Sequence, residues 1–199
     1  MNILSNWLFR WICLAFIFCS VSFVFSAESL NPHKLPNISR KVINLYFDHQ
    51  ENLISTQFAN YRINGLKGGV FVTLSKNGKT RACWGFMHPQ NNNLIQDTIQ
   101  ATLGALNKEY RYAPIKKSEI NDLKIQITII NSIQPINTIK GQNALKSGLF
   151  VRAGNKSAVI LPGEALNAQY QLMLAKQKAG IALHEKHQLY SLKAQIFKE

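Results

Sequence analysis

Hydrophobic residues recur with a helical period in three segments of the chain. The first segment begins at Asn37, and its apolar face carries Ile38, Val42, Leu45, Tyr46 and Leu53. The second follows Asn93, whose side chain can cap a helix, and its apolar face carries Ile95, Ile99, Leu103 and Leu106. The third covers 164–179, ends at Gly180, and carries Leu166, Tyr170 and Met173. The pattern therefore predicts three helices, separated by segments of another kind.

The segments between these helices alternate between apolar and polar residues, as half-buried strands do. Val70, Val72 and Leu74 form the first alternation, and Asn77-Gly78 predicts a tight hairpin whose return strand is 80–86. Further strands are predicted at 124–130 and 190–196, and a second hairpin around Gly154-Asn155. We expect 131–146 to be a looser connection. Hairpins and helices that do not alternate regularly predict an α+β fold, with antiparallel or mixed sheets and packed helices.

The first 27 residues differ in kind from the rest. Arg10 is followed by an uncharged apolar run from Trp11 to Phe25, and then by the small residues Ser26 and Ala27. This order is typical of a signal peptide, so residues 1–27 predict export to the periplasm or the cell exterior. The alternative is an uncleaved membrane anchor over 7–25, although its apolar run is shorter than the about 20 residues of a comfortable span.

Two prolines follow the predicted signal peptide. Pro32 and Pro36 favour an extended backbone in the residues before them, so 28–36 is predicted to be a tether. The folded domain is then predicted over 37–199.

Basic residues outnumber acidic ones. The chain has 23 Lys and Arg against 10 Asp and Glu, which gives a formal net charge of +13. This surplus favours a small anionic molecule or an acidic partner, and the alternative is a basic surface that only aids solubility. The sequence contains no nucleic-acid motif, so no nucleic-acid partner is expected. A membrane is expected as a partner only if the N-terminal segment stays uncleaved.

Cys83 is the cysteine that would remain after removal of the signal peptide, because Cys13 and Cys19 lie within that segment. A single thiol cannot form an internal disulfide. An exposed free thiol is open to oxidation in an oxidising compartment. Cys83 is therefore expected to be either buried or chemically active.

Several short motifs occur in a distinctive order. Arg81-Ala82-Cys83-Trp84-Gly85 lies on the predicted return strand, and Glu109-Tyr110-Arg111-Tyr112-Ala113-Pro114 follows the second predicted helix. Gly148-Leu149, Leu161-Pro162 and Lys178-Ala179-Gly180 come later. Together they resemble the AMMECR family, whose signatures are Leu-Arg-Gly-Cys-Ile-Gly and Asp-x-Arg-Phe-x-Pro. The chain departs from the first signature at Thr80, Ala82 and Trp84.

The resemblance covers about 38–197. It implies an α+β fold in two sheet-containing parts with a cleft between them. It also implies a family without a settled activity, whose members are usually intracellular. An exported member would depart from that setting. Trp84 stands where the family has a branched aliphatic side chain, so the pocket beside Cys83 is expected to be reshaped.

The basic residues near these motifs suggest a binding site. Arg81 and Arg111 could hold a phosphate or a carboxylate in the implied cleft, and Trp84 could offer a stacking surface. Tyr112 is expected to pack in the core. We therefore expect a cleft for a small anionic ligand or partner, bordered by Arg81, Cys83, Trp84 and Arg111.

The alternative is a cysteine-dependent transferase or hydrolase. Cys83 would be its nucleophile, Arg81 on the same strand face would favour the thiolate, and His88 would act as the base. The simpler interpretation makes Cys83 a small buried residue and Arg81 an ion-pair partner, for example of Glu109.

No cofactor or metal ion is expected. The chain has no glycine-rich phosphate loop, no Gly-x-Ser-x-Gly motif and no convincing pair of carboxylates. His184-Glu185-Lys186-His187 resembles a metalloprotease motif but has one residue too few between its histidines. We expect a solvated turn there.

Overall fold

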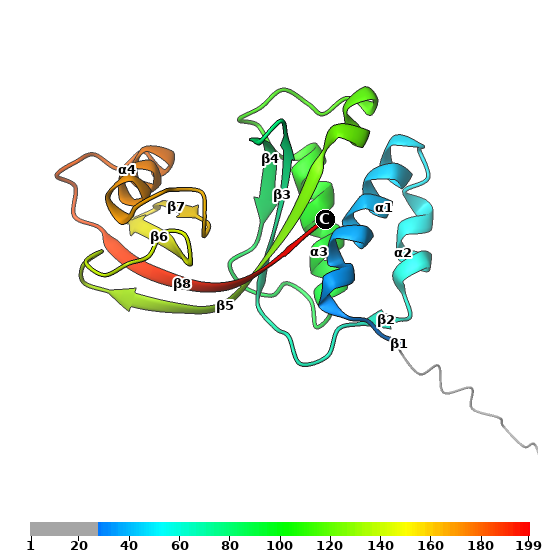
Figure 1. Cartoon of the computed structure of the whole chain (residues 1–199), viewed down its shortest axis with the longest axis horizontal. Helices are drawn as coiled ribbons and strands as arrows, with labels where there is room; N and C mark the ends of the chain where they lie inside the picture. The colour runs from blue at the N-terminus through cyan, green and yellow to red at the C-terminus, as the bar shows by residue number, and fades with distance from the viewer. Residues whose placement is uncertain (1–27) are drawn as a thin grey trace, which may run out of the picture.

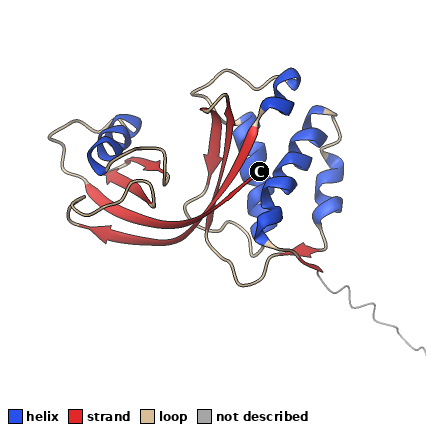
Figure 2. Cartoon of the chain, viewed as in Figure 1, coloured by secondary structure: helices blue, strands red, loops and turns tan. Residues whose placement is uncertain are grey.

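The computed structural model describes residues 28–199, and the predicted signal peptide or anchor within 1–27 lies outside the described residues. Its helices are α1 (Leu35–Phe47), α2 (Asn52–Phe58), α3 (Leu94–Asn107) and α4 (Ala168–Ala179), with short 3-10 helices at Pro32–Lys34 and Lys117–Asp122 (Figure 2). Its strands are β1 (Glu28–Ser29), β2 (Tyr61–Arg62), β3 (Gly69–Lys76), β4 (Lys79–Gly85), β5 (Lys124–Ile136), β6 (Ser147–Ala153), β7 (Lys156–Ile160) and β8 (Gln188–Lys198).

One six-stranded antiparallel sheet runs through the molecule in the order β4-β3-β5-β8-β6-β7. β1 and β2 form a separate parallel pair. β5 and β8 are the long central strands, and they pair from Gln126–Lys198 to Ile136–Leu189. The combination of a curved antiparallel sheet with packed helices confirms the predicted α+β class.

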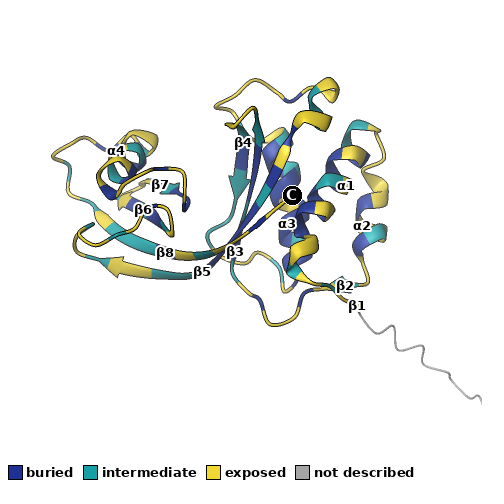
Figure 3. Ribbon diagram, in the orientation of Figure 1, coloured by how far each residue is buried: buried dark blue, intermediate teal, exposed yellow. Residues whose placement is uncertain are grey.

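The long strands carry two lobes (Figure 1). In the large lobe, α1 and α3 cover β3, β4 and the first half of β5, and the core includes Leu35, Val72 and Ile127. In the small lobe, α4 covers β6 and β7 around Leu149, Val151 and Ala175. Figure 3 shows buried residues in both lobes. A third and smaller buried cluster consists of Cys83, Ile130, Leu161 and Leu192, so it joins residues of the two lobes.

The first predicted hairpin is confirmed. Val70, Val72 and Leu74 of β3 are fully buried, as their alternation requires. Asn77 and Gly78 have φ values of 52° and 73°, the left-handed conformation that a two-residue hairpin turn needs. The predicted strand at 124–130 is also confirmed, because Ile125, Ile127 and Ile129 are buried in the large-lobe core.

The predicted tether over 28–36 is wrong. Glu28 and Ser29 pair with β2, and α1 begins at Leu35. Both prolines occupy the first turn of a helix, Pro32 in the 3-10 helix and Pro36 in α1. Proline is tolerated there because the first turn has no intrahelical partner for its missing N–H group.

The helical period that begins at Asn37 does not continue to Leu53 as one helix. α1 ends at Phe47, and α2 begins at Asn52. His49, between them, has a φ of 58°, which a right-handed helix does not allow. The loose connection expected over 131–146 is likewise shorter, because β5 continues to Ile136 beyond a register shift between Ile130 and Ser132.

The predicted C-terminal end of the third helix is confirmed, but the residues predicted to form its buried face are exposed. Gly180 ends α4 with a φ of 67°, as predicted. Tyr170 and Met173, however, are exposed, and Leu166 lies before the helix with 82% of its surface exposed. The most deeply buried residues of α4 include the small or polar side chains Ala168, Gln171 and Ala175, and Leu172 and Leu174 pack against the small-lobe core while partly exposed. Within residues 28–199, no helix has both the length and the apolar character to cross a bilayer.

Candidate functional site

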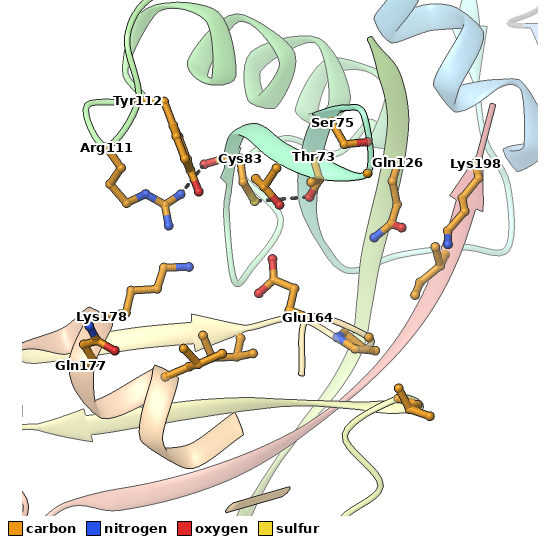
Figure 4. A pocket seen from close by; sticks show the side chains of 18 residues that line it. Thr73, Ser75, Cys83, Arg111, Tyr112, Gln126, Glu164, Gln177, Lys178 and Lys198 are labelled. Atoms are coloured by element: carbon orange, nitrogen blue, oxygen red, sulfur yellow. Dashed lines mark hydrogen bonds between the residues drawn. The ribbon is translucent and has the colours of Figure 1, made fainter. Parts of the chain in front are cut away.

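A cleft of about 870 Å³ lies between the two lobes (Figure 4). Its large-lobe wall consists of residues from β3, β4 and the segment after α3, and its small-lobe wall of residues from β7, α4 and the loop between them. β5 contributes Gln126 to the lining, and β8 contributes Ile196 and Lys198. The side chains that the following paragraphs use are Thr73, Ser75, Thr80, Cys83, Arg111, Tyr112, Gln126, Glu164, Lys178 and Lys198.

Cys83 lies on the large-lobe wall, where it is 8% exposed. Its thiol faces Thr73 on the neighbouring strand, with the Thr73 hydroxyl donating to Sγ at 3.3 Å. Burial raises the pKa of the Cys83 thiol above its ordinary value, and the Glu164 carboxylate raises that pKa further. The Thr73 hydroxyl, Lys178 and Arg111 oppose this shift without reversing it. Burial and the Glu164 carboxylate therefore both favour the neutral thiol of Cys83 over the thiolate.

An ion pair between Glu109 and Arg111 covers the backbone of Cys83 at the free edge of β4. Glu109 accepts from the Cys83 amide at 3.1 Å, and Arg111 Nη2 donates to the Cys83 carbonyl at 3.2 Å. Arg111 also makes two bonds to the Glu109 carboxylate, from Nε at 2.8 Å and from Nη2 at 2.5 Å. The pair thus occupies the hydrogen-bonding positions that another strand would use, and it fixes the guanidinium beside Cys83.

Burial and hydrogen bonding together determine the pKa values of Glu109 and Arg111. The Glu109 side chain is 4% exposed and that of Arg111 is 32% exposed. Burial alone would raise the pKa of Glu109, but the hydrogen bonds from Arg111 and from the Cys83 amide outweigh it and lower this pKa. The same contacts raise the pKa of Arg111, so both groups are charged at neutral pH.

The opposite wall brings a cation and a carboxylate from the small lobe. Lys178, in the last turn of α4, extends toward Arg111 across the cleft, and Glu164 points toward Thr73 and Cys83 (Figure 4). Lys178 is anchored by a bond of 2.8 Å to the Val159 carbonyl, and Glu164 accepts from the Leu161 amide at 2.9 Å. Lys198 of β8 adds a third cation to the lining.

Arg81 does not share the cleft face of β4 with Cys83, and the expectation that it would is wrong. Ser75 pairs with Thr80 and Leu74 with Ala82, so Arg81 is an extra, bulged residue. A bulge shifts the alternation of the strand, and Thr80 faces the cleft in place of Arg81. Arg81 instead binds Glu119 at 3.0 Å and the carbonyls of Ala113 and Pro114. Its ion-pair partner is thus Glu119, whose pKa it lowers to about 2, and not Glu109.

Trp84 and His88 also lie outside the cleft lining. Trp84 packs on the opposite face of β4 against α3, where a Cβ atom on Gly104 would come within 2.1 Å of its ring. His88 is exposed in the loop between β4 and α3, away from the residues that line the cleft. The geometry therefore assembles Cys83 and Arg111 of the predicted site and separates Arg81, Trp84 and His88 from it.

Sequence reasoning missed several residues of the cleft. Tyr112, expected in the core, is 39% exposed, lines the cleft and lies 5.7 Å from the Arg111 guanidinium. Glu164, Lys178 and Lys198 were not predicted, although Lys178 belongs to one of the motifs that carry the resemblance. Only the folding of β5 and β8 brings these distant segments opposite Cys83.

Among residues 28–199, no group of three or more His, Cys, Asp or Glu side chains is placed to hold a metal ion. In the predicted solvated turn, His187 Nδ1 lies 2.8 Å from the Glu185 carbonyl.

Comparison with known proteins gives a consistent family assignment. A family model described as AMMECR1 matches residues 36–199. A protein of Thermotoga maritima is 30% identical over 118 residues, which are 58% of this chain and 68% of that protein. A protein of Methanosarcina mazei is 27% identical over 158 residues, 73% of this chain and 76% of that protein. A protein of Clostridium acetobutylicum is 29% identical over 130 residues, 64% of this chain but 28% of that protein.

A solved structure has the same fold. The crystal structure of an uncharacterized protein from Pyrococcus horikoshii matches with a TM-score of 0.68 and 24% identity, covering 84% of this chain and 90% of that one. At this identity the likeness concerns the fold alone.

Proposed function

We propose that this chain, which belongs to the AMMECR1 family, binds a small anionic ligand in the cleft between its two lobes. The observation that carries the proposal is the convergence of Arg111 and Lys178, which reach into the cleft from opposite walls (Figure 4). With Lys198, three cations face one carboxylate, Glu164, in the lining. An anion between the walls would be attracted from both sides.

Arg111 is prepared for such a ligand. Its Nε and Nη2 atoms are held by Glu109 and by the Cys83 carbonyl, whereas Nη1 makes no hydrogen bond within residues 28–199. A guanidinium that is already fixed loses little conformational freedom when it binds an anion. Phosphate and carboxylate oxygens both match its donors.

The remaining lining suits a polar ligand body. Thr73, Ser75, Thr80 and Gln126 present hydroxyl and amide groups from β3, β4 and β5. Tyr112 adds an aromatic ring beside Arg111. The cleft volume of about 870 Å³ is within the about 300–1,000 Å³ of small-molecule sites. We infer a ligand with one anionic group and several hydrogen-bonding groups.

Inorganic pyrophosphate provides a simple probe of this proposal. Calorimetric titration should show that Lys178→Met weakens pyrophosphate binding by about tenfold, the effect of losing one charge-assisted hydrogen bond. Lys198→Met should also weaken it. Lys193→Met is the matched control, because Lys193 lies on the same strand as Lys198 but does not line the cleft. Equal losses for all three variants would indicate nonspecific attraction to a basic surface and contradict the proposal.

A cysteine-dependent transferase or hydrolase is less well supported. The raised pKa of Cys83 favours the thiol over the nucleophilic thiolate, and His88 does not line the cleft. The neutral thiol next to Thr73 is better suited to filling space than to attacking a substrate.

We also propose that the protein is exported. The support is the N-terminal sequence itself, with Arg10, the uncharged run from Trp11 to Phe25 and the small residues Ser26 and Ala27. Burial of Cys83 fits an oxidising compartment, because it shields the thiol. Mass spectrometry of the protein from fractionated cells should find a chain that begins near Ala27 outside the cytoplasm. An intact chain in the cytoplasm would contradict export.

A further inference from the structure

A second pocket, which we call the outer pocket, lies beside α4 and contains about 700 Å³. The cleft and the outer pocket use different residues of this helix: Leu174 and Lys178 line the cleft, whereas Leu172, Met173 and Lys176 line the outer pocket. Gln177 borders both. The two sites are therefore neighbours separated by the helix.

The outer pocket is mainly apolar. Its apolar lining residues are Ile139, Leu172, Met173, Ile181, Ala182 and Leu183. Two of these residues are exposed to solvent: Met173 is 48% exposed and Leu183 is 81% exposed. Exposed apolar groups gathered around a concavity are typical of a ligand-binding surface.

A buried lysine lies among these apolar residues. Lys176 is 7% exposed, and its Nζ donates to the Leu183 carbonyl at 2.5 Å. An ammonium group has three N–H donors, and a buried charge normally requires a partner of opposite charge. The acid nearest in sequence, Glu185, is close enough for Lys176 to help lower its pKa. Its carboxylate is nevertheless bound to Lys156 at 2.9 Å and to the Ala182 amide, and within residues 28–199 it makes no ion pair with Lys176. A carboxylate that entered the outer pocket would give Lys176 a direct partner.

We propose that the outer pocket binds an amphipathic carboxylate such as a medium-chain fatty acid. The carboxylate would accept hydrogen bonds from Lys176 Nζ, with His187 also in the lining, and the apolar chain would cover Met173 and Leu183. The volume of about 700 Å³ matches a small molecule, within the about 300–1,000 Å³ of such sites. This site is independent of the anion bound in the cleft, which needs Lys178 rather than Lys176.

Decanoate and 1-decanol, used below micelle-forming concentrations, test the proposal by calorimetric titration into the folded protein. Decanoate should bind at least about tenfold more tightly than decanol, because only the acid can form the charge-assisted bond to Lys176. Lys176→Met should remove this preference by weakening decanoate alone. Lys178→Met should leave decanoate binding unchanged while it weakens pyrophosphate binding, so a failure of the cleft proposal is distinguishable from a failure of this one.

A matched pair of leucines tests the apolar part of the site. Leu183 is 81% exposed and lines the outer pocket, whereas Leu166 is 82% exposed and does not. Leu183→Ala should weaken decanoate binding several-fold, and Leu166→Ala should not. This pair keeps the test decisive even if Lys176→Met fails to fold. Absence of binding, equal binding of acid and alcohol, or equal effects of the two leucine variants would overturn the proposal.

Discussion

Arg111→Ala should lower the free energy of unfolding by about 2 kcal/mol at neutral pH and abolish pyrophosphate binding in the cleft. The stability loss arises because Glu109, 4% exposed, would keep a buried charge without its guanidinium partner. Fully buried pairs lose about 3–5 kcal/mol on such a change, and the value here is smaller because Arg111 is 32% exposed. The binding loss arises because one of the two opposing cations is removed.

The stability effect of Arg111→Ala should depend on pH with a defined sign. In the wild type the pKa of Glu109 is lowered, so its charged form adds stability above the ordinary carboxyl pKa, and this contribution is lost as the pH falls through the folded-state pKa. In the variant, burial without the ion pair should raise the pKa of Glu109. The unpaired charge then costs stability at neutral pH, and the cost disappears on protonation. The difference between the two proteins should therefore shrink on acidification.

Denaturant unfolding at neutral and acidic pH measures this difference. The double variant Glu109→Gln/Arg111→Ala is the control, because an amide replaces the buried charge and should restore part of the stability without restoring pyrophosphate binding. A stability loss that is the same at both pH values, or that the double variant does not reduce, would contradict the role assigned to the pair.

Alkylation of Cys83 should be far slower in the folded protein than in the unfolded chain, and its pH midpoint should lie above the ~8.5 of a free thiol. Burial slows the reaction and raises the pKa of Cys83, and the Glu164 carboxylate raises this pKa further because it disfavours a negative charge on the thiol. The rate of modification by iodoacetamide, followed by mass spectrometry across a pH series, measures the midpoint. Iodoacetamide is uncharged, so its approach is not biased by the cations of the cleft.

Two substitutions should move this midpoint in opposite directions. Glu164→Gln removes a negative charge and should lower the pKa of Cys83, whereas Thr73→Val removes the hydroxyl donor and should raise it. Rapid modification with a midpoint well below that of a free thiol would instead favour the cysteine-dependent enzyme.

The elements that local patterns determine could be predicted from the sequence. The alternation of Val70, Val72 and Leu74, the turn at Asn77-Gly78 and the end of α4 at Gly180 all depend on neighbours along the chain. The face of α4 could not be predicted in this way. The predicted residues Tyr170 and Met173 are exposed, and the small-lobe core instead contacts Ala175, Leu172 and Leu174.

Only those cleft residues that lie close to recognisable motifs could be predicted from the sequence. Cys83 and Arg111 lie close to recognisable motifs, and the structure brings them together. Because of the bulge in β4, the Arg81 side chain does not share the strand face of Cys83 as expected. No residue type in the sequence indicates that bulge. Lys178 reaches the site only through the curvature of β5 and β8, which depends on the whole sheet.

A crystal of the domain over residues 28–199, soaked in tungstate as an electron-dense analogue of phosphate, tests most directly whether the cleft binds an anion. An anomalous-scattering peak should appear between Arg111 and Lys178 in the wild type and be absent in Lys178→Met. A cleft without tungstate, in a crystal where no neighbouring molecule blocks the cleft, would contradict the proposal that this cleft binds an anion.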